Sequence, residues 1–347
     1  MFRRSKIWVL SLVLAGYMCL TLLWADNAVF IDYLYYLRRL FYLFVFFGLT
    51  IELVLRYPKF IDSLFIFLCW VAAITAVVSI CRFYSSFSSP PPRLSHVGDQ
   101  LHNPVVGATV YGMVALICCF RVLKTRKDSY PRWLYIGILV VILFFALLTQ
   151  GRGPLGALLI TFLSGAVITR DKRLIAVVLC VIIAGGLAFF YVEGVKEMII
   201  SRGFSYRLEI WQQTLARTKG ALLFGQGIST ERMLVMADGS TWNHPHSVYF
   251  ATILFGGLAG LFLLLALQAL ALRQSFLCLF RENDPTYVAL LLFAFICITT
   301  ANYRVISHPD ALWMYLWLPL ALLAAKEIFN KSLMSFNHNE GREKCSG

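Results

Sequence analysis

Long apolar runs recur from one end of the chain to the other, separated by short polar segments. Each run extends for roughly 20 residues, the length that an α-helix needs to cross a bilayer. Strands of a membrane barrel would alternate apolar and polar positions, which these runs do not. The pattern predicts an all-α integral membrane protein with about ten transmembrane helices, at approximate residues 7–24, 39–55, 60–81, 103–121, 133–150, 153–169, 174–191, 247–272, 285–302 and 309–328.

The predicted helices divide the chain into parts of unequal character. The first apolar run follows a basic start and is long enough to span, so we interpret it as an uncleaved first helix. One polar segment is much longer than the others and separates the seventh helix from the eighth. The expected parts are a bundle of seven helices (1–191), a large outer loop (192–246), three more helices (247–328) and a cytoplasmic tail (329–347).

Composition supports a membrane location and explains the basic charge. The 347 residues are 59% hydrophobic and only 14% charged, too few charges to cover a water-soluble surface. The formal net charge of +13 would suggest nucleic acid as a partner if the protein were soluble. In a membrane protein, basic residues gather instead in the cytoplasmic loops. We therefore expect no nucleic-acid partner.

The basic residues also predict the orientation. With the N-terminus inside, the inner segments hold 19 Lys and Arg and the outer segments hold 12, so both termini are expected in the cytoplasm. Ten of the 12 outer residues are Arg, and five of the six His are also outside. Arginine binds phosphate with a planar fork, and histidine exchanges protons near neutral pH. Any chemistry is therefore expected at the outer face.

The sequence lacks several other functional patterns. Its nine cysteines lie mainly in apolar runs and form no CxxC, so we expect neither a disulfide framework nor a metal site. There is no acidic pair suited to a metal-bound nucleotide sugar, no phosphate-binding loop and no nucleophile elbow. The short turn Gly225–Gln226–Gly227 is too brief to indicate a dinucleotide site.

A first candidate lies in the tight outer hairpin Gln150–Gly151–Arg152–Gly153–Pro154, which joins two apolar runs. Arg152 would lie at or just inside the interface, where a charge is costly without an anion or water. It is either a functional anion ligand or an arginine whose side chain extends to the lipid headgroups.

A second candidate lies in the large outer loop. Phe204, Leu208, Trp211 and Leu215 recur at helical spacing, with Ser205 as a candidate N-cap. The pattern predicts an amphipathic helix near the membrane surface.

Two residues of that helix stand four apart and so share one face, namely Arg207 and Trp211. They form either a functional pair or a cation–π pair that only holds the helix.

The third candidate is the His-Pro-His sequence before the eighth helix. Pro245 suits a first helical turn, so His246 is expected at the outer N-terminal end of that helix. The helix terminus and nearby arginines would depress the pKa of His246 and keep it neutral, as a general base requires. The alternatives are an interfacial pair with His244 that only bonds backbone or water, and a weakly supported zinc site.

Together these three constellations resemble the O-antigen ligase and polymerase superfamily of bacterial envelope glycosyltransferases. The likeness extends from about Asn103 to Leu323. The family pattern of Thr or Ser, Gln, any residue and Arg is matched by Thr149–Gln150–Gly151–Arg152. An Arg shortly before an aromatic residue is matched by Arg207 and Trp211. A His followed by a polar residue, nine residues, Gly, two residues and a small residue is matched by His246, Ser247, Gly257 and Gly260.

The resemblance implies a helical fold like that of the GT-C glycosyltransferases, with no cofactor and no metal. Its donor would be a polysaccharide on undecaprenyl pyrophosphate, and its acceptor the lipid A–core, at the periplasmic face of a Gram-negative inner membrane. Carried over to this chain, Arg152 and Arg207 would hold the pyrophosphate, and His246 would deprotonate or position the acceptor hydroxyl. Two arginines could neutralise the leaving group without a metal, and transfer would invert the anomeric centre. Family members often have about twelve spans, against the ten predicted here.

Further polar residues at the outer face are expected to support the substrates. They are His244 and Trp211, near the candidates above, and Arg304, His308 and Asp310, between the last two helices.

Other functions remain compatible with the sequence. An O-antigen polymerase or a protein O-oligosaccharyltransferase would use the same type of donor. A transporter of lipid-linked sugars belongs to another class and should line its midplane with polar residues or broken helices. Here the predicted helices are apolar and the polar groups gather outside. A purely structural membrane protein would leave the outer Arg and His without a role.

Overall fold

The structure is a computed structural model that describes residues 5–85, 93–95, 101–125, 130–170, 172, 175, 179, 207–230, 233–236, 239–300 and 304–343, with side chains to residue 331. Its elements are α1 (Lys6–Leu20), η2 (Thr21–Trp24), α2 (Phe30–Arg56), α3 (Phe60–Ser85), α4 (Pro104–Lys124), α5 (Tyr130–Leu148), α6 (Arg152–Thr169), α9 (Arg207–Arg217), η4 (Thr218–Gly220), β1 (Leu234–Val235), β2 (Thr241–Trp242), α10 (Val248–Glu282), α11 (Thr286–Cys297), the π-helical η5 (Trp313–Trp317) and α12 (Leu318–Glu343).

Six helices of the described chain are long and apolar enough to cross a membrane: α1 with η2, α3, α4, α5, α6 and α10. The helical membrane class is therefore confirmed. The predicted spans 39–55 and 309–328 lie within α2 and within η5 and α12, while 285–302 contains the 12-residue α11. Span 174–191 lies almost wholly outside the described residues, so the count of ten stays a prediction.

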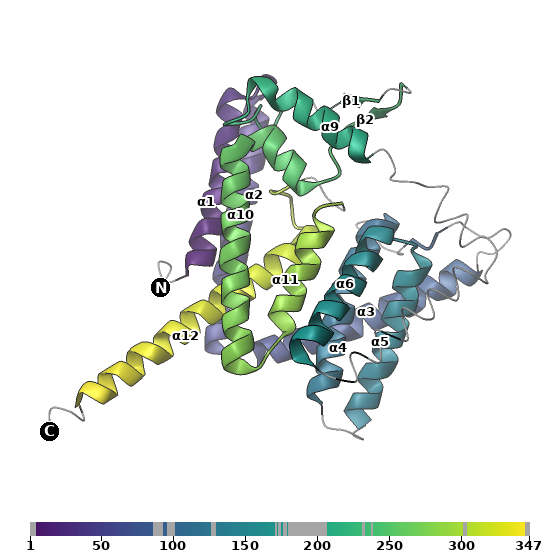
Figure 1. The fold of residues 1–347 in the computed structure, drawn as a ribbon, viewed down its shortest axis with the longest axis vertical. Helices are drawn as coiled ribbons and strands as arrows, with labels where there is room; N and C mark the ends of the chain where they lie inside the picture. Colours follow the sequence, from purple (N-terminus) through teal and green to yellow (C-terminus); the bar gives the residue numbers. More distant parts are fainter. Residues whose placement is uncertain are drawn as a thin grey trace.

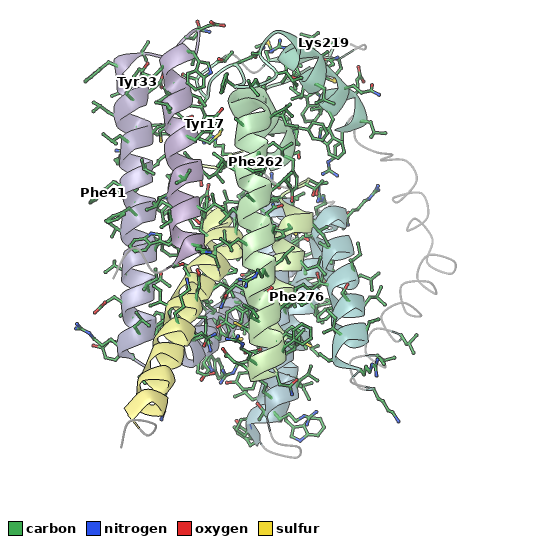
Figure 2. All side chains as sticks on the ribbon, turned by 60° about the vertical axis from the view of Figure 1, so that its left-hand side comes forward. Tyr17, Tyr33, Phe41, Lys219, Phe262 and Phe276 are labelled. Carbon is green, nitrogen blue, oxygen red and sulfur yellow. The ribbon has the colours of Figure 1, made fainter. Side chains whose placement is uncertain are left out.

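The helices form two packed groups (Figure 1). In one group α1 packs on α2, α10 and α12, and in the other α4 packs on α3, α5 and α6. Helix α11 touches α10 and α12 on one side and α4 and α6 on the other, so it joins the two groups. Figure 2 shows α1, α2 and α10 side by side with Phe41 and Phe262 pointing outward. These rings are 60% and 70% exposed, as expected for side chains that face lipid rather than water.

Helix α10 is broken near its start. Gly257 has φ 62° and ψ −162°, so the helical hydrogen bonds across it are lost. A turn at residues 221–227 replaces them. The amides of Leu258 and Ala259 donate to carbonyls of this turn at 2.9 and 3.1 Å, and the amides of Gln226 and Gly227 donate to carbonyls of α10 at 2.8 and 3.0 Å. Backbone groups that the kink frees are thus satisfied, as a lipid environment requires.

The glycines at this crossing permit the close approach. A Cβ at Gly257 would lie 2.4 Å from the carbonyl oxygen of Leu223, and one at Gly225 would lie 2.4 Å from the main chain of Phe255. Both glycines also have positive φ, which a residue with a side chain rarely adopts. The turn Gly225–Gln226–Gly227, which is too short for a dinucleotide site, therefore has a structural role. Gly257, the glycine in the motif that begins at His246, shares that role.

The segment between α6 and α10 contains the predicted amphipathic helix, α9, and a small antiparallel ribbon of β1 and β2. The buried face of α9 differs from the predicted one. Ile210 and Thr214 are fully buried, whereas Leu208 and Leu215 are 54% and 43% exposed. Ile210 packs with Leu234 of β1, because the ribbon, which the helical periodicity could not reveal, covers that side. The candidate N-cap Ser205, with Phe204, lies outside the described residues.

The two ends of the bundle differ in content. One end carries α9, the ribbon and the start of α10 (Figure 1), and we call it the site end. The other end, where α4 and α10 finish and α11 begins, is the opposite end.

Candidate functional site

His246 occupies a strained turn at the site end. Its φ is +52°, a left-handed value that costs about 1 kcal/mol or more for a residue other than glycine. Helix α10 begins at Val248 with Ser247 as its N-cap, so His246 precedes the cap. The prediction that Pro245 lies in the first helical turn is therefore wrong, because the chain reverses at His246 before the helix begins.

The strained turn is held from both sides. The indole Nε1 of Trp211 donates to the carbonyl oxygen of Pro245 at 3.2 Å, and the Trp211 ring stacks on Phe250 at 4.8 Å between centroids. The amide of Val248 donates to the carbonyl oxygen of Ile298 at 2.9 Å. Trp211 thus joins α9 to the residues before and after His246. Trp211 thereby supports the turn of His246, and its predicted support of the substrates stays a prediction.

Two aromatic rings surround the imidazole of His246. The ring of His244 lies 3.8 Å from it and that of Trp242 lies 5.2 Å from it, both edge to face. The Nε2 atom of His246 is buried, with no hydrogen-bond partner among the described residues. A buried ring nitrogen without a partner is costly in a resting protein and is available to a bound molecule.

Arg207, the first residue of α9, sets the charge around this imidazole. Burial, and to a smaller extent the nearby positive charge of Arg207, lower the pKa of His246 to about 4. Burial also lowers the pKa of Arg207 from its ordinary value. His246 is therefore neutral at physiological pH, as the sequence predicted, although burial contributes more than the arginine.

Arg152 begins α6 at the same end and is exposed. The residue after it, Gly153, packs against Thr300, since a Cβ at Gly153 would lie 2.7 Å from the Thr300 hydroxyl. The carbonyl oxygen of Thr300 also accepts a hydrogen bond of 3.4 Å from Nη2 of Arg207. Thr300 thus contacts both arginine-bearing segments.

The turn that follows α11 is therefore the common support of the three candidates. Ile298 holds the start of α10 beside His246, and Thr300 touches the segments of Arg152 and Arg207. Sequence reasoning placed residues 285–302 inside one span and missed this role. A threonine at the end of an apolar run carries no distinctive pattern, so no sequence signal would have identified it.

The three polar residues predicted between the last helices have different positions. Asp310 caps the next helix, because its Oδ1 accepts from the amide of Leu312 at 2.9 Å. His308 is exposed, and Arg304 lines a narrow cavity with Met18 and Phe255. Among the described residues no hydrogen bond joins His308 or Asp310 to the three candidates, so their contact with substrate stays a prediction.

A buried arginine beneath this loop was not singled out by the sequence. Arg39 is only 1% exposed, its Nη1 donates to the carbonyl oxygen of Ile306 at 3.2 Å, and its guanidinium lies 3.5 Å above the ring of Tyr35. The predicted span 39–55 begins at this residue, and an arginine at the edge of a span commonly extends to the headgroups. The structure instead places it inside the bundle as a support for the loop.

Comparison with known proteins agrees with the resemblance drawn from the three motifs. A family model described as O-antigen ligase matches residues 137–265, which include Arg152, Arg207 and His246. The chain is also 28% identical to an O-antigen ligase of Pseudomonas aeruginosa over 327 residues, which cover 92% of this chain and 78% of that protein. The resemblance to O-antigen ligases is therefore confirmed, and it extends over most of the chain.

Proposed function

We propose that this protein is an O-antigen ligase that moves a polysaccharide from undecaprenyl pyrophosphate to a sugar hydroxyl of the lipid A–core. The likeness to O-antigen ligases supports a glycosyltransferase that acts on a lipid-linked polysaccharide. The site end faces the periplasm of the inner membrane, in the N-in and C-in orientation that the distribution of Lys and Arg favours.

One observation carries the proposal: a neutral, half-buried histidine lies beside a half-buried arginine, and a single turn supports both together with the segment of a second arginine. Arg207 lowers the pKa of His246, and Thr300 contacts the segments of Arg207 and Arg152. Two guanidinium groups can bind the two phosphates of a lipid pyrophosphate and stabilise the charge that develops on them. No metal is needed for that neutralisation.

The reaction then has simple bond changes. Nε2 of His246 accepts the proton of the acceptor hydroxyl, and the hydroxyl oxygen attacks the anomeric carbon of the donor. The bond from that carbon to the phosphate oxygen breaks, and its electrons leave on the lipid pyrophosphate. Attack from the face opposite the leaving group inverts the anomeric configuration.

Binding of the donor is coupled to the strength of the base. With a pKa of about 4, His246 is a weak base in the empty protein. A pyrophosphate on Arg207 would offset the positive charge that depresses this pKa. The imidazole therefore becomes more basic when the donor is in place, which limits proton transfer to the loaded site.

The function can be tested by deleting the gene and separating the lipopolysaccharide on a gel. Loss of a ligase leaves bare core while lipid-linked polymer accumulates. Loss of a polymerase, the nearest alternative, would instead leave core that carries a single repeat unit. An unchanged ladder would contradict both functions.

Complementation with His246→Ala tests the assigned base. General-base catalysis contributes about 10²- to 10⁴-fold, so the variant should leave the ladder nearly absent. His102→Ala is the matched control, because His102 is an exposed histidine just before α4. Full restoration of the ladder by His246→Ala, at equal protein level, would rule out the proposed base.

A further inference from the structure

Arg93 makes two hydrogen bonds with the turn after α5, and neither the sequence motifs nor the proposed mechanism uses it. It lies in the short described segment 93–95, far from α5 in the sequence but packed against its end. Nε of Arg93 donates to the carbonyl oxygen of Thr149 at 2.9 Å, and Nη2 donates to that of Gln150 at 3.3 Å. The amide of the buried Leu94 donates to the carbonyl oxygen of Leu148 at 3.1 Å.

These bonds bind three successive carbonyls where α5 ends. The last carbonyls of a helix have no partner within the helix and need one from elsewhere. A forked guanidinium can reach two of them at once with fixed geometry. The segment therefore fixes the direction in which the chain leaves α5.

The turn that is fixed leads directly to Arg152. Only residues 149–151 separate α5 from α6, and Arg152 is the first residue of α6. Gln150 has a left-handed φ of 53°, an uncommon conformation that its surroundings must maintain. Gly151 is closely packed, since a Cβ there would lie 2.8 Å from that of Ala108. A turn this short transmits a change at Gln150 to the side chain of Arg152.

We infer that Arg93 is a positioning residue for Arg152: it clamps the carbonyls of Thr149 and Gln150 and so aims Arg152 at the anionic donor. The inference rests on the proposed function, in which Arg152 binds pyrophosphate. The clamp has an electrostatic effect as well. The carbonyl end of α5 is partly negative and would repel an anion at the start of α6, and Arg93 offsets that charge.

A double-mutant cycle with Arg152 tests this assignment. Activity is measured in proteoliposomes with lipid-linked polysaccharide and purified lipid A–core. Arg93→Ala should raise the KM for the donor and lower kcat/KM by about tenfold, with a smaller change in kcat. Adding Arg93→Ala to Arg152→Ala should cost little more than Arg152→Ala alone, because residues that act through one another are not additive. Arg93→Lys should recover part of the loss.

Arg82→Ala is the matched control, because Arg82 is an exposed arginine in the last turn of α3. It should leave both kinetic constants unchanged. A readout independent of activity is hydrogen exchange of the amides at residues 146–153, which Arg93→Ala should accelerate and Arg82→Ala should not.

The outcomes separate this inference from the proposed function. If Arg152→Ala is as active as the wild type, the assigned phosphate ligand is wrong, and the role of Arg93 is overturned with it. If Arg152→Ala keeps measurable but reduced activity and the two losses add independently, or if hydrogen exchange is unchanged by Arg93→Ala, only the inference about Arg93 is overturned.

Discussion

The two ends of the bundle use their basic residues in opposite ways. At the opposite end, Arg121 pairs with Asp62 of α3, and Lys124, also on α4, pairs with Asp284 just before α11. Lys326 of α12 pairs with Glu282 at the end of α10. At the site end, three arginines donate instead to main-chain carbonyls, those of Ile306, Thr149, Gln150 and Thr300.

The two kinds of bond suggest different roles for the two ends, structural support at the opposite end and substrate binding at the site end. A carboxylate cancels the charge of its partner, so the ion pairs at the opposite end join helices and leave little field. A carbonyl carries no net charge, so its hydrogen bond fixes the geometry of a guanidinium without itself cancelling the positive charge. These carbonyl bonds therefore orient guanidinium groups at the site end without neutralising them, which suits an anionic substrate. Three predictions test this contrast.

The largest expected effect is the loss of activity when either assigned phosphate ligand becomes lysine. Arg152→Lys and Arg207→Lys keep the charge but lose the planar fork, and each should lower kcat/KM by about 100-fold or more if both phosphates are held by bidentate contacts. Arg121→Lys at the opposite end keeps its charge beside Asp62 and should change kcat/KM less than twofold. The variants are compared in proteoliposomes. If Arg121→Lys lowers kcat/KM as much as Arg152→Lys or Arg207→Lys does, the two ends do not differ in function.

A smaller effect is expected in the pH dependence. Because the pKa of His246 is about 4 in the free protein, kcat/KM should stay flat from pH 7 to about 5 and fall as the imidazole is protonated near pH 4. In the loaded enzyme the donor offsets the charge of Arg207, so kcat should begin to fall at a higher pH than kcat/KM does. Two profiles that both fall near pH 6.5 would show that neither burial nor Arg207 acts on His246.

The smallest effect is expected from the ion pairs at the opposite end. Lys124→Ala should lower stability by about 1 kcal/mol or less, because the lysine is half exposed, and should leave kcat unchanged. Lys124→Arg, which keeps a positive charge beside Asp284, should retain most of the thermal stability measured in detergent. A loss of kcat greater than tenfold in the single variant would mean that this end is not merely supportive.

The sequence predicted the helical membrane class and supplied the residues of the candidate site, but not the support that unites them. Runs of apolar residues identify helices because lipid demands them, and the spacing around His246 was specific enough to suggest the family. The meeting of three distant segments at Ile298 and Thr300 depends on how helices pack, which no local pattern encodes. The roles of Arg152, Arg207 and His246 stay predictions.

Local conformation was predicted less well than the helices themselves. The left-handed φ of His246 was missed because Pro245 suggested a helical turn, whereas contacts from Trp211 and α11 determine the chain path there. The buried face of α9 was misassigned because the ribbon covers Ile210, and the pairing of β1 with β2 involves only two residues of each strand. Such short strands leave no detectable periodicity in a sequence.

The break at Gly257 has a consequence for how the protein is made. Helix α10 has 35 residues, or about 52 Å at 1.5 Å per residue, which exceeds the thickness of the hydrocarbon core. The part after Gly257 is about 38 Å long and suffices to cross alone. Residues 221–227 leave the ribosome before this helix does, so the partner for its broken hydrogen bonds is already synthesised when it enters the membrane. A side chain added at Gly225 should therefore impair membrane insertion and lower the yield of folded protein, whatever its effect on catalysis.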